Sequence, residues 1–281
     1  MPSFDTPEPI VANLEPVVGN VRIVASDRTD TTVDVRPSDP ADASDVKAAE
    51  QTRVEYAGGT LTVKAPRMWP LDFTNKTRSI EVTIELPTGS QVHGSTGLGD
   101  LHCTGTLGTV RYKSGIGHLQ LDRTGELHLH TATGNVDVGH VEGKADVSTS
   151  SGRLHIADVA GACVLKNSNG ATTIGTANGS TRARSANGDI TVEHAEDSVD
   201  AKTANGSVRV LDAVRGALTL ETALGEVEIG IRAGSAAWLD VKTQFGRVRN
   251  EMTEATSPDD ATDKVEVRAS TSVGDITVRR S

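Results

Sequence analysis

Two histidines, His128 and His130, stand two residues apart in the segment GELHLHTATG (125–134) and are the first candidates for metal chemistry. On a strand they would project from the same side. Zinc needs three or four converging ligands, whereas the neighbouring repeats would add one carboxylate, Asp146, among several repelling cations. The pattern therefore favours a solvated surface, and we predict no metal site.

A column of basic side chains recurs about once every 18 residues and could follow an anionic polymer or a partner. Acidic residues in the adjacent column favour charge compensation between neighbouring strands instead. The segment RMWPLDF (67–73) is an apolar protrusion that favours a cap packed on the end of the fold and leaves a partner surface open. The candidate interaction surface consists of Lys113, His128, His130, Lys166, Arg184, Lys202, Trp69 and Phe73.

The residues suggest no catalytic site. Enzymes that act on sugars need paired carboxylates, usually beside aromatic platforms, and the outward positions contain no such pair. The calcium-binding β-roll needs an Asp in every turn, whereas the turns TANG, SANG and NSNG repeat no carboxylate. There is no Gly-rich phosphate loop before a helix, no nucleophile elbow and no CxxC motif. We predict no catalytic residue and no cofactor.

Composition restricts the partners and the compartment. A net charge of -10 disfavours nucleic acid and anionic lipid, which need a basic face. The start, MPSFDTPEPIVANLEP, has no basic segment before an apolar run, and no stretch reaches the length of a membrane helix. We therefore expect a cytoplasmic protein. Cys103 and Cys163 are expected to lie too far apart for a disulfide and to be small buried hydrophobic residues.

Regularly spaced glycines divide most of the chain into repeats of about 18 residues. Two and four residues after these glycines the chain is apolar, except at Thr172 and Asn250, and one and three residues after them it is almost always polar. This alternation predicts strands with one buried and one wet face. The series consists of Gly99, Gly117, Gly134, Gly152, Gly170, Gly188, Gly206, Gly225, Gly246 and Gly274.

Three residues before each glycine stands a small residue that can form hydrogen bonds. Such columns stack only if successive repeats lie parallel and in register, so we expect a ladder in which neighbours satisfy each hydroxyl. The predicted structural ladder consists of Thr96, Ser114, Thr131, Thr149, Asn167, Ser185, Thr203, Thr222, Thr243 and Thr271. A shorter ladder is expected in the turns, formed by Asn169, Asn187 and Asn205.

These patterns predict an all-β fold, a parallel β-helix (β-solenoid) with about 18 residues and two strands in each turn of the solenoid, called a coil below. Residues 93–281 form its regular part, with a loop insertion at 250–264. Residues 1–92 are expected to be irregular coils and a cap of the same domain, with GNVRI and TTVDV as one early coil and a short helix within 38–51. Such a cap would cover the open strand edges of a solenoid end.

The repeated TxxGxVxV units at 203–229, together with VTIELPTGSQVHGSTGLGDL at 82–101 and AAWLDVKTQFGRVRN at 236–250, resemble the bacterial DUF4097 family of β-strand-repeat proteins, also called "putative adhesin". The resemblance covers nearly the whole chain and implies a right-handed parallel β-solenoid. It implies no catalytic residue, cofactor or substrate. The adhesin name implies export.

The sequence therefore favours a non-enzymatic scaffold or protein-interaction module, which presents a flat face to an unknown protein partner or to itself as a dimer. Two alternatives stay open: a carbohydrate-binding or carbohydrate-active β-helix protein, and a self-assembling structural protein. Short, regular turns disfavour the first alternative, and the bulky ends of the chain disfavour a filament.

Overall fold

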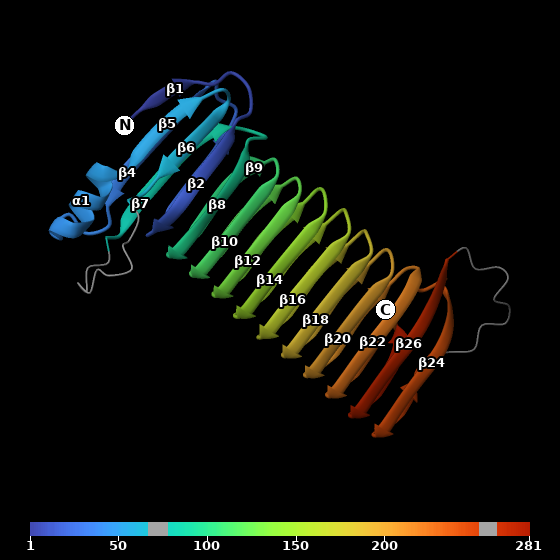
Figure 1. The fold of residues 1–281 in the computed structure, drawn as a ribbon. Coiled ribbons are helices and arrows are strands. Elements are labelled where there is room, and N and C mark those ends of the chain that lie inside the picture. The colour runs from blue at the N-terminus through green and yellow to red at the C-terminus, as the bar shows by residue number, and fades with distance from the viewer. Residues whose placement is uncertain (67–77, 253–262) are drawn as a thin grey trace. The chain divides into compact units, whose positions relative to one another are not determined.

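The computed structural model describes residues 1–66, 78–252 and 263–281. The chain divides into two compact units, residues 1–137 and 138–281. Within each unit successive strands of the repeat alternate between two sheets, so that each coil contributes one strand to each sheet (Figure 1). Neighbouring coils pair in parallel. The predicted parallel β-solenoid is confirmed.

In the first unit the strand order is β1-β4-β7-β3-β9-β11 in one sheet and β5-β6-β2-β8-β10-β12 in the other. Helix α1 (Ala43–Gln51) packs against β4 and β7. The strands are β1 (Ser3–Asp5), β2 (Val11–Val18), β3 (Val21–Ser26), β4 (Asp30–Pro37), β5 (Arg53–Ala57), β6 (Thr60–Lys64), β7 (Ile80–Pro87), β8 (Gln91–Leu98), β9 (Leu101–Leu107), β10 (Val110–Ile116), β11 (Leu119–Thr124) and β12 (Leu127–Thr133).

In the second unit the orders are β15-β17-β19-β21-β23-β27-β25 and β14-β16-β18-β20-β22-β26-β24. Strand β13 (Val136–Val141) includes the boundary between the units. The other strands are β14 (Ala145–Ser151), β15 (Leu154–Val159), β16 (Cys163–Asn169), β17 (Thr172–Ala177), β18 (Thr181–Asn187), β19 (Ile190–Ala195), β20 (Val199–Asn205), β21 (Val208–Ala213), β22 (Gly216–Leu224), β23 (Val227–Ile231), β24 (Ala236–Phe245), β25 (Val248–Asn250), β26 (Lys264–Val273) and β27 (Ile276–Arg280).

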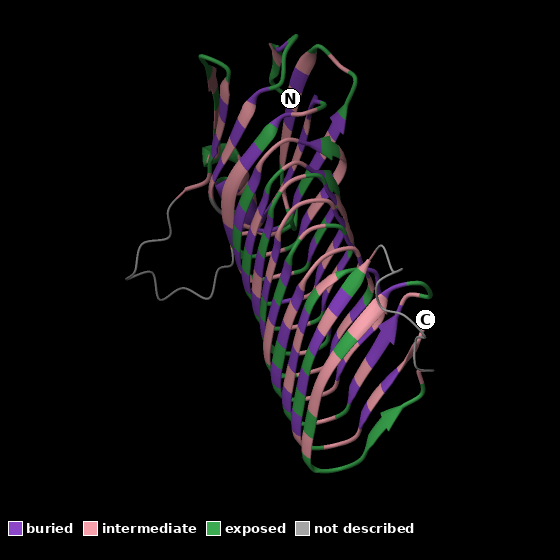
Figure 2. Cartoon of the chain, turned by 90° about the vertical axis from the view of Figure 1, so that its right-hand side faces the viewer, coloured by how far each residue is buried: buried purple, intermediate pink, exposed green. Residues whose placement is uncertain are grey.

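The register reproduces the period of the sequence. Ala145 pairs with Cys163 and Cys163 with Thr181, each 18 residues further along the chain. Buried and accessible residues alternate along the strands, as Figure 2 shows. Because the strands of one coil face each other across a narrow interior, Val, Ile, Leu and Ala fill the core.

The first 92 residues are less regular than the coils that follow. Strand β3, which contains most of GNVRI, pairs in parallel with β9, as expected for a coil. The segment TTVDV (31–35) does not complete that coil, because it lies in β4, which pairs antiparallel with β1 and β7. The turn before β4 lacks a corner glycine and is fixed instead by Arg28, which forms ion pairs with Asp30 and Glu85.

The C-terminal coils are not stacked in sequence order, contrary to the simplest interpretation of the glycine series. The last coil, β26 and β27, lies between the coil of β22 and β23 and the coil of β24 and β25. We call β24 and β25 the terminal coil. It contains Asn250 at a position, four residues after the corner glycine, where every other coil of the glycine series has an apolar residue. The coil that departs from the repeat therefore lies at the end, where its core positions are less enclosed.

Stacking depends on the glycine at one corner of each coil. Gly206 has φ +140°, and a Cβ there would lie 2.4 Å from the carbonyl oxygen of Gly188 in the preceding coil. Gly225 repeats this arrangement on Gly206, where the distance would be 2.0 Å. Glycine is required at these corners both by the dihedral angle and by the close approach of the backbones.

We expect Gly206→Ala to lower the free energy of unfolding by about 1–3 kcal/mol or more, because it adds a backbone clash to an unfavourable dihedral angle. The matched control is Gly234→Ala, where φ is +94° and no atom lies within 4 Å of the added Cβ. Urea unfolding followed by circular dichroism compares the two variants. Equal losses would show that the contact between coils contributes nothing.

Candidate interaction surfaces

The predicted basic column lies on the outer face of the even-numbered strands. In the first unit Lys113 is paired in register with His130, and Arg111 with His128. Lys113 and His130 are exposed, while His128 is half-buried. The two histidines thus share one face of β12. No group of three or more potential metal ligands occurs in residues 1–66, 78–252 and 263–281.

In the second unit Lys166, Arg184 and Lys202 follow one another in register. Lys202 forms an ion pair with Glu221 at 2.7 Å, and Arg184 forms one with Asp200. Two of the three cations are therefore compensated by carboxylates on their own sheet. The assignment of this column to a partner stays a prediction.

The two aromatic members of the predicted surface, Trp69 and Phe73, lie outside the described residues, as does most of the predicted insertion at 250–264. The two cysteines lie in β9 and β16, and both are free and buried. Burial raises the pKa of the Cys163 thiol to about 12. It also raises that of Cys103.

The ladder residues lie at the inner corner, in register wherever a pairing is defined. Thr96, Ser114 and Thr131 align in the first unit, and the second unit continues the pattern. Thr271 lies between Thr222 and Thr243, because the last coil is inserted there. In the second unit the aligned sets are Thr149, Asn167 and Ser185, and Thr203, Thr222, Thr271 and Thr243. Ser185 and Thr243 are half-buried, and the others are buried.

The sequence predicted that neighbouring ladder hydroxyls bond to one another. The structure shows that they do not. Thr222 donates to the carbonyl oxygen of Gly206 at 2.8 Å, and Thr203 donates to that of Gly188 at 3.1 Å. The same bond to a glycine carbonyl oxygen of the adjacent coil is made by three further ladder residues: Thr271 to Gly225, Thr243 to Gly274, and the Asn167 amide to Gly152. Strands about 4.8 Å apart hold two stacked hydroxyls beyond the roughly 2.8 Å of a hydrogen bond.

Amide side chains can span that distance because donor and acceptor stand on different atoms. Asn187 donates to Asn169 at 2.9 Å, and Asn205 donates to Asn187 at 2.8 Å. The predicted asparagine ladder is therefore present. It closes the corner just before each glycine in three successive coils.

Two histidine clusters were missed in the sequence. His140 lies between Asp158, at 2.6 Å from Nδ1, and Glu142, at 3.0 Å from Nε2. His194 repeats the arrangement with Asp212 at 2.8 Å and Glu196 at 2.9 Å. The signal was present as H-x-E followed by Asp 18 residues after the histidine, which occurs twice, three coils apart. Each cluster joins neighbouring coils on the other sheet from the basic column.

The His140 cluster is electrostatically tuned. The hydrogen bond to Glu142 raises the pKa of His140, and the bond to Asp158 adds to this effect. Partial burial lowers the pKa but does not outweigh the two carboxylates. A raised pKa in the folded state means that the imidazolium stabilises the fold. The arrangement is suited to holding a proton and to joining two coils.

The terminal coil exposes more large apolar side chains than the coils that precede it in the second unit. Phe245 is 72% exposed, Trp238 57% and Val248 44%. In the adjacent coil Val265 and Val267 are fully buried, whereas their partners Ala237 and Leu239 in β24 are only half-buried. The core of the second unit thus reaches the surface at this end.

An apolar row at the corner extends this surface. Leu224, Val273 and Phe245 align in register and are all exposed. They continue the asparagine column, since Asn205 is paired with Leu224. The corner therefore changes from amide to apolar over the last three coils of the stack.

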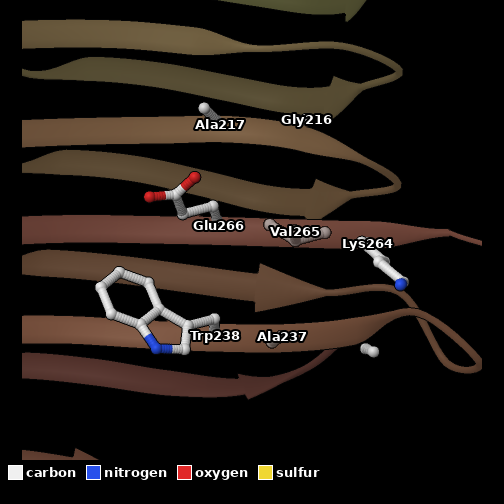
Figure 3. Close-up of a pocket in the computed structure, with 8 residues that line it drawn as sticks. Gly216, Ala217, Ala237, Trp238, Lys264, Val265 and Glu266 are labelled. Carbon is white, nitrogen blue, oxygen red and sulfur yellow. The ribbon is translucent and has the colours of Figure 1, made fainter. Parts of the chain in front are cut away.

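Trp238 borders an open depression that spans β22, β26 and β24. Figure 3 shows its indole ring on β24 beside Glu266 of β26, with Lys264 toward one end. Small residues, Ala217 and Gly216 among them, also line it. Of the exposed apolar side chains of the terminal coil, Trp238 lines this depression, whereas Phe245 and Val248 do not.

A family model described as Toastrack DUF4097 matches residues 18–279. The chain belongs to the DUF4097 family. The resemblance found in its repeats is therefore confirmed.

Two solved structures resemble this DUF4097 chain. One is a "putative adhesin" from Bacteroides fragilis NCTC 9343, with 15% identity, a TM-score of 0.44, and coverage of 99% of this chain and 95% of the other. The second is a "putative cell adhesion protein" from Clostridium sporogenes ATCC 15579, with 12% identity, a TM-score of 0.30, and coverage of 100% and 98%. No curated protein matches the chain.

Within the described ranges, no helix has the length and apolar character that crossing a membrane requires.

The corner hydroxyls allow a matched test in the second unit. Thr222→Val should lower the free energy of unfolding by about 1 kcal/mol, because it removes the bond to Gly206. Thr149→Val should be neutral or stabilising, because the buried Thr149 hydroxyl has no hydrogen-bond partner. Chemical denaturation measures both. The reverse order of stabilities would contradict this assignment of the hydroxyls.

The His140 cluster should make stability depend on pH. Its contribution is complete below the unfolded pKa of about 6.5 and is lost as pH rises through the higher folded pKa. Urea unfolding at about pH 6 and pH 8 should show that His140→Asn reduces the loss seen in the wild type. His130→Asn, an exposed imidazole outside this cluster, controls for the substitution. An unchanged pH dependence in His140→Asn would refute the role of the cluster.

Proposed function

We propose that this DUF4097 chain is a non-enzymatic scaffold that binds a protein through the terminal coil of its second unit. The observation that carries the proposal is the apolar surface formed by Phe245, Trp238 and Val248 with the adjoining Val273 and Leu224. Neighbouring exposed apolar side chains mark contact sites, and Leu224, Val273 and Phe245 form such a row at the corner. Within the described residues β26 is the strand that pairs with β24, so the other edge of β24 offers backbone hydrogen bonds as well.

The polar residues of the second unit support a scaffold. His140, His194, Arg184 and Lys202 pair with carboxylates of the same or the next coil. These pairs hold neighbouring coils in register. We assign them to maintaining the shape that presents the terminal coil. The cytoplasmic location stays a prediction.

Photo-crosslinking in the source cells tests this proposal. A photoreactive phenylalanine analogue at position 245 should yield a covalent adduct with a protein, either another chain or a second copy. The same analogue at Ser151, which is exposed at the same corner several coils away, is the control. No adduct from position 245, or the same adducts from position 151, would overturn the proposal.

A further inference from the structure

Strand β24 has one free edge. It pairs in parallel with β26, and no other strand pairs with it within residues 1–66, 78–252 and 263–281. The backbone N–H of Ala236 donates to Asp263, toward β26. Because backbone groups alternate along a strand, Ala237, Leu239 and Val241 direct their N–H and C=O groups to the free edge. These three residues also face the core.

We propose that a second copy of this chain adds its own β24 antiparallel to this edge, around a two-fold axis at Val241. The inference rests on the proposed function and names the partner at that site. A two-fold interface uses the same patch on both copies. A single edge strand can therefore supply both sides of the contact.

Charge distinguishes an axis at Val241 from the two adjacent axes. In a symmetric antiparallel pair, two residues that lie opposite each other project from the same face of the sheet only if the two-fold axis passes through a residue position. An axis at Asp240 would place the two Asp240 side chains opposite each other, and an axis at Lys242 would do the same with lysines. An axis at Val241 places Asp240 opposite Lys242 of the second copy, twice. Opposite charges across a strand pair stabilise it, whereas like charges destabilise it.

The same register covers apolar surface. Leu239 and Val241, half-buried now, would lie against the terminal coil of the second copy and continue the core. Phe245 would lie opposite Ala237 of the second copy, and Trp238 opposite Gln244. The two Val241 residues would form a hydrogen-bonded pair at the axis, because their backbone groups face the edge. Charge, apolar cover and backbone direction thus agree on one register.

The test is the molar mass of the purified full chain, measured by size exclusion with light scattering over a concentration series. The wild type should be a dimer. Asp240→Lys and Lys242→Asp should each raise the dimer dissociation constant by about tenfold or more, because two attractive pairs become repulsive. The double variant, Asp240→Lys with Lys242→Asp, should restore the dimer, since each lysine again faces an aspartate.

Two further variants control for the fold. Glu221→Lys makes the same charge reversal on β22, two strands from the edge, and should leave the dimer intact. Val241→Pro removes only the N–H that faces the edge, so it should give a folded monomer. Circular dichroism confirms folding of each variant.

A wild type that is monomeric at every concentration, or a double variant that fails to restore the dimer, would overturn this inference. If position 245 gives an adduct with a different protein and the wild type is monomeric, the proposed dimer is refuted and the proposed function is retained. Absence of both adduct and dimer removes both.

Discussion

The carbonyl group of the corner glycine is the contact on which the stacking of coils depends. The carbonyl of Gly206 accepts the hydroxyl of Thr222 and lies where a Cβ on Gly225 would stand. One oxygen therefore specifies two residues of the next coil, a hydrogen-bond donor and, three positions later, a glycine. The same pair of contacts recurs on the carbonyls of Gly152, Gly188, Gly225 and Gly274. The T-x-x-G units at 203–206, 222–225, 243–246 and 271–274 reflect this contact, whereas the buried hydroxyls of Thr131 and Thr149 have no hydrogen-bond partner.

Register between coils is then reinforced by side chains that reach one coil along the stack. Amides do so in the turn, where Asn205 bonds to Asn187, and imidazoles do so on the sheet, where His140 bonds to Asp158. These contacts are individually modest, since most are partly exposed. Together they oppose a slip of one residue, which would move every core side chain to the solvent face.

The sequence predicted what repeats. Strand positions, core parity and parallel stacking all follow from a period of 18 and an alternation of 2, which the register of Ala145 on Cys163 reproduces. It predicted poorly what occurs once. The antiparallel strand β4 has no periodic partner to reveal its direction. Where a ladder hydroxyl is bonded to the next coil, as Thr203 is, the acceptor is a main-chain oxygen, and a main-chain group cannot be recognised from the residue type. Asn250 at a core position indicated that its coil is unusual. It did not indicate that the last coil, β26 and β27, would be inserted before it in the stack.

The same distinction between repeated and unique residues bears on where a partner can be recognised. Interior coils have nearly the same contacts on both sides, so their sequences are constrained by their neighbours. Within the described residues the terminal coil has a neighbour on one side only, and it departs from the repeat at Asn250. Because β26 and β27 hold it in place from a later part of the chain, this unusual coil is fixed at the end although it lacks a complete core of its own. Had the coils followed sequence order, the end would present the regular Val265 and Val267 pattern, and the residues that differ from the repeat would be enclosed within the stack.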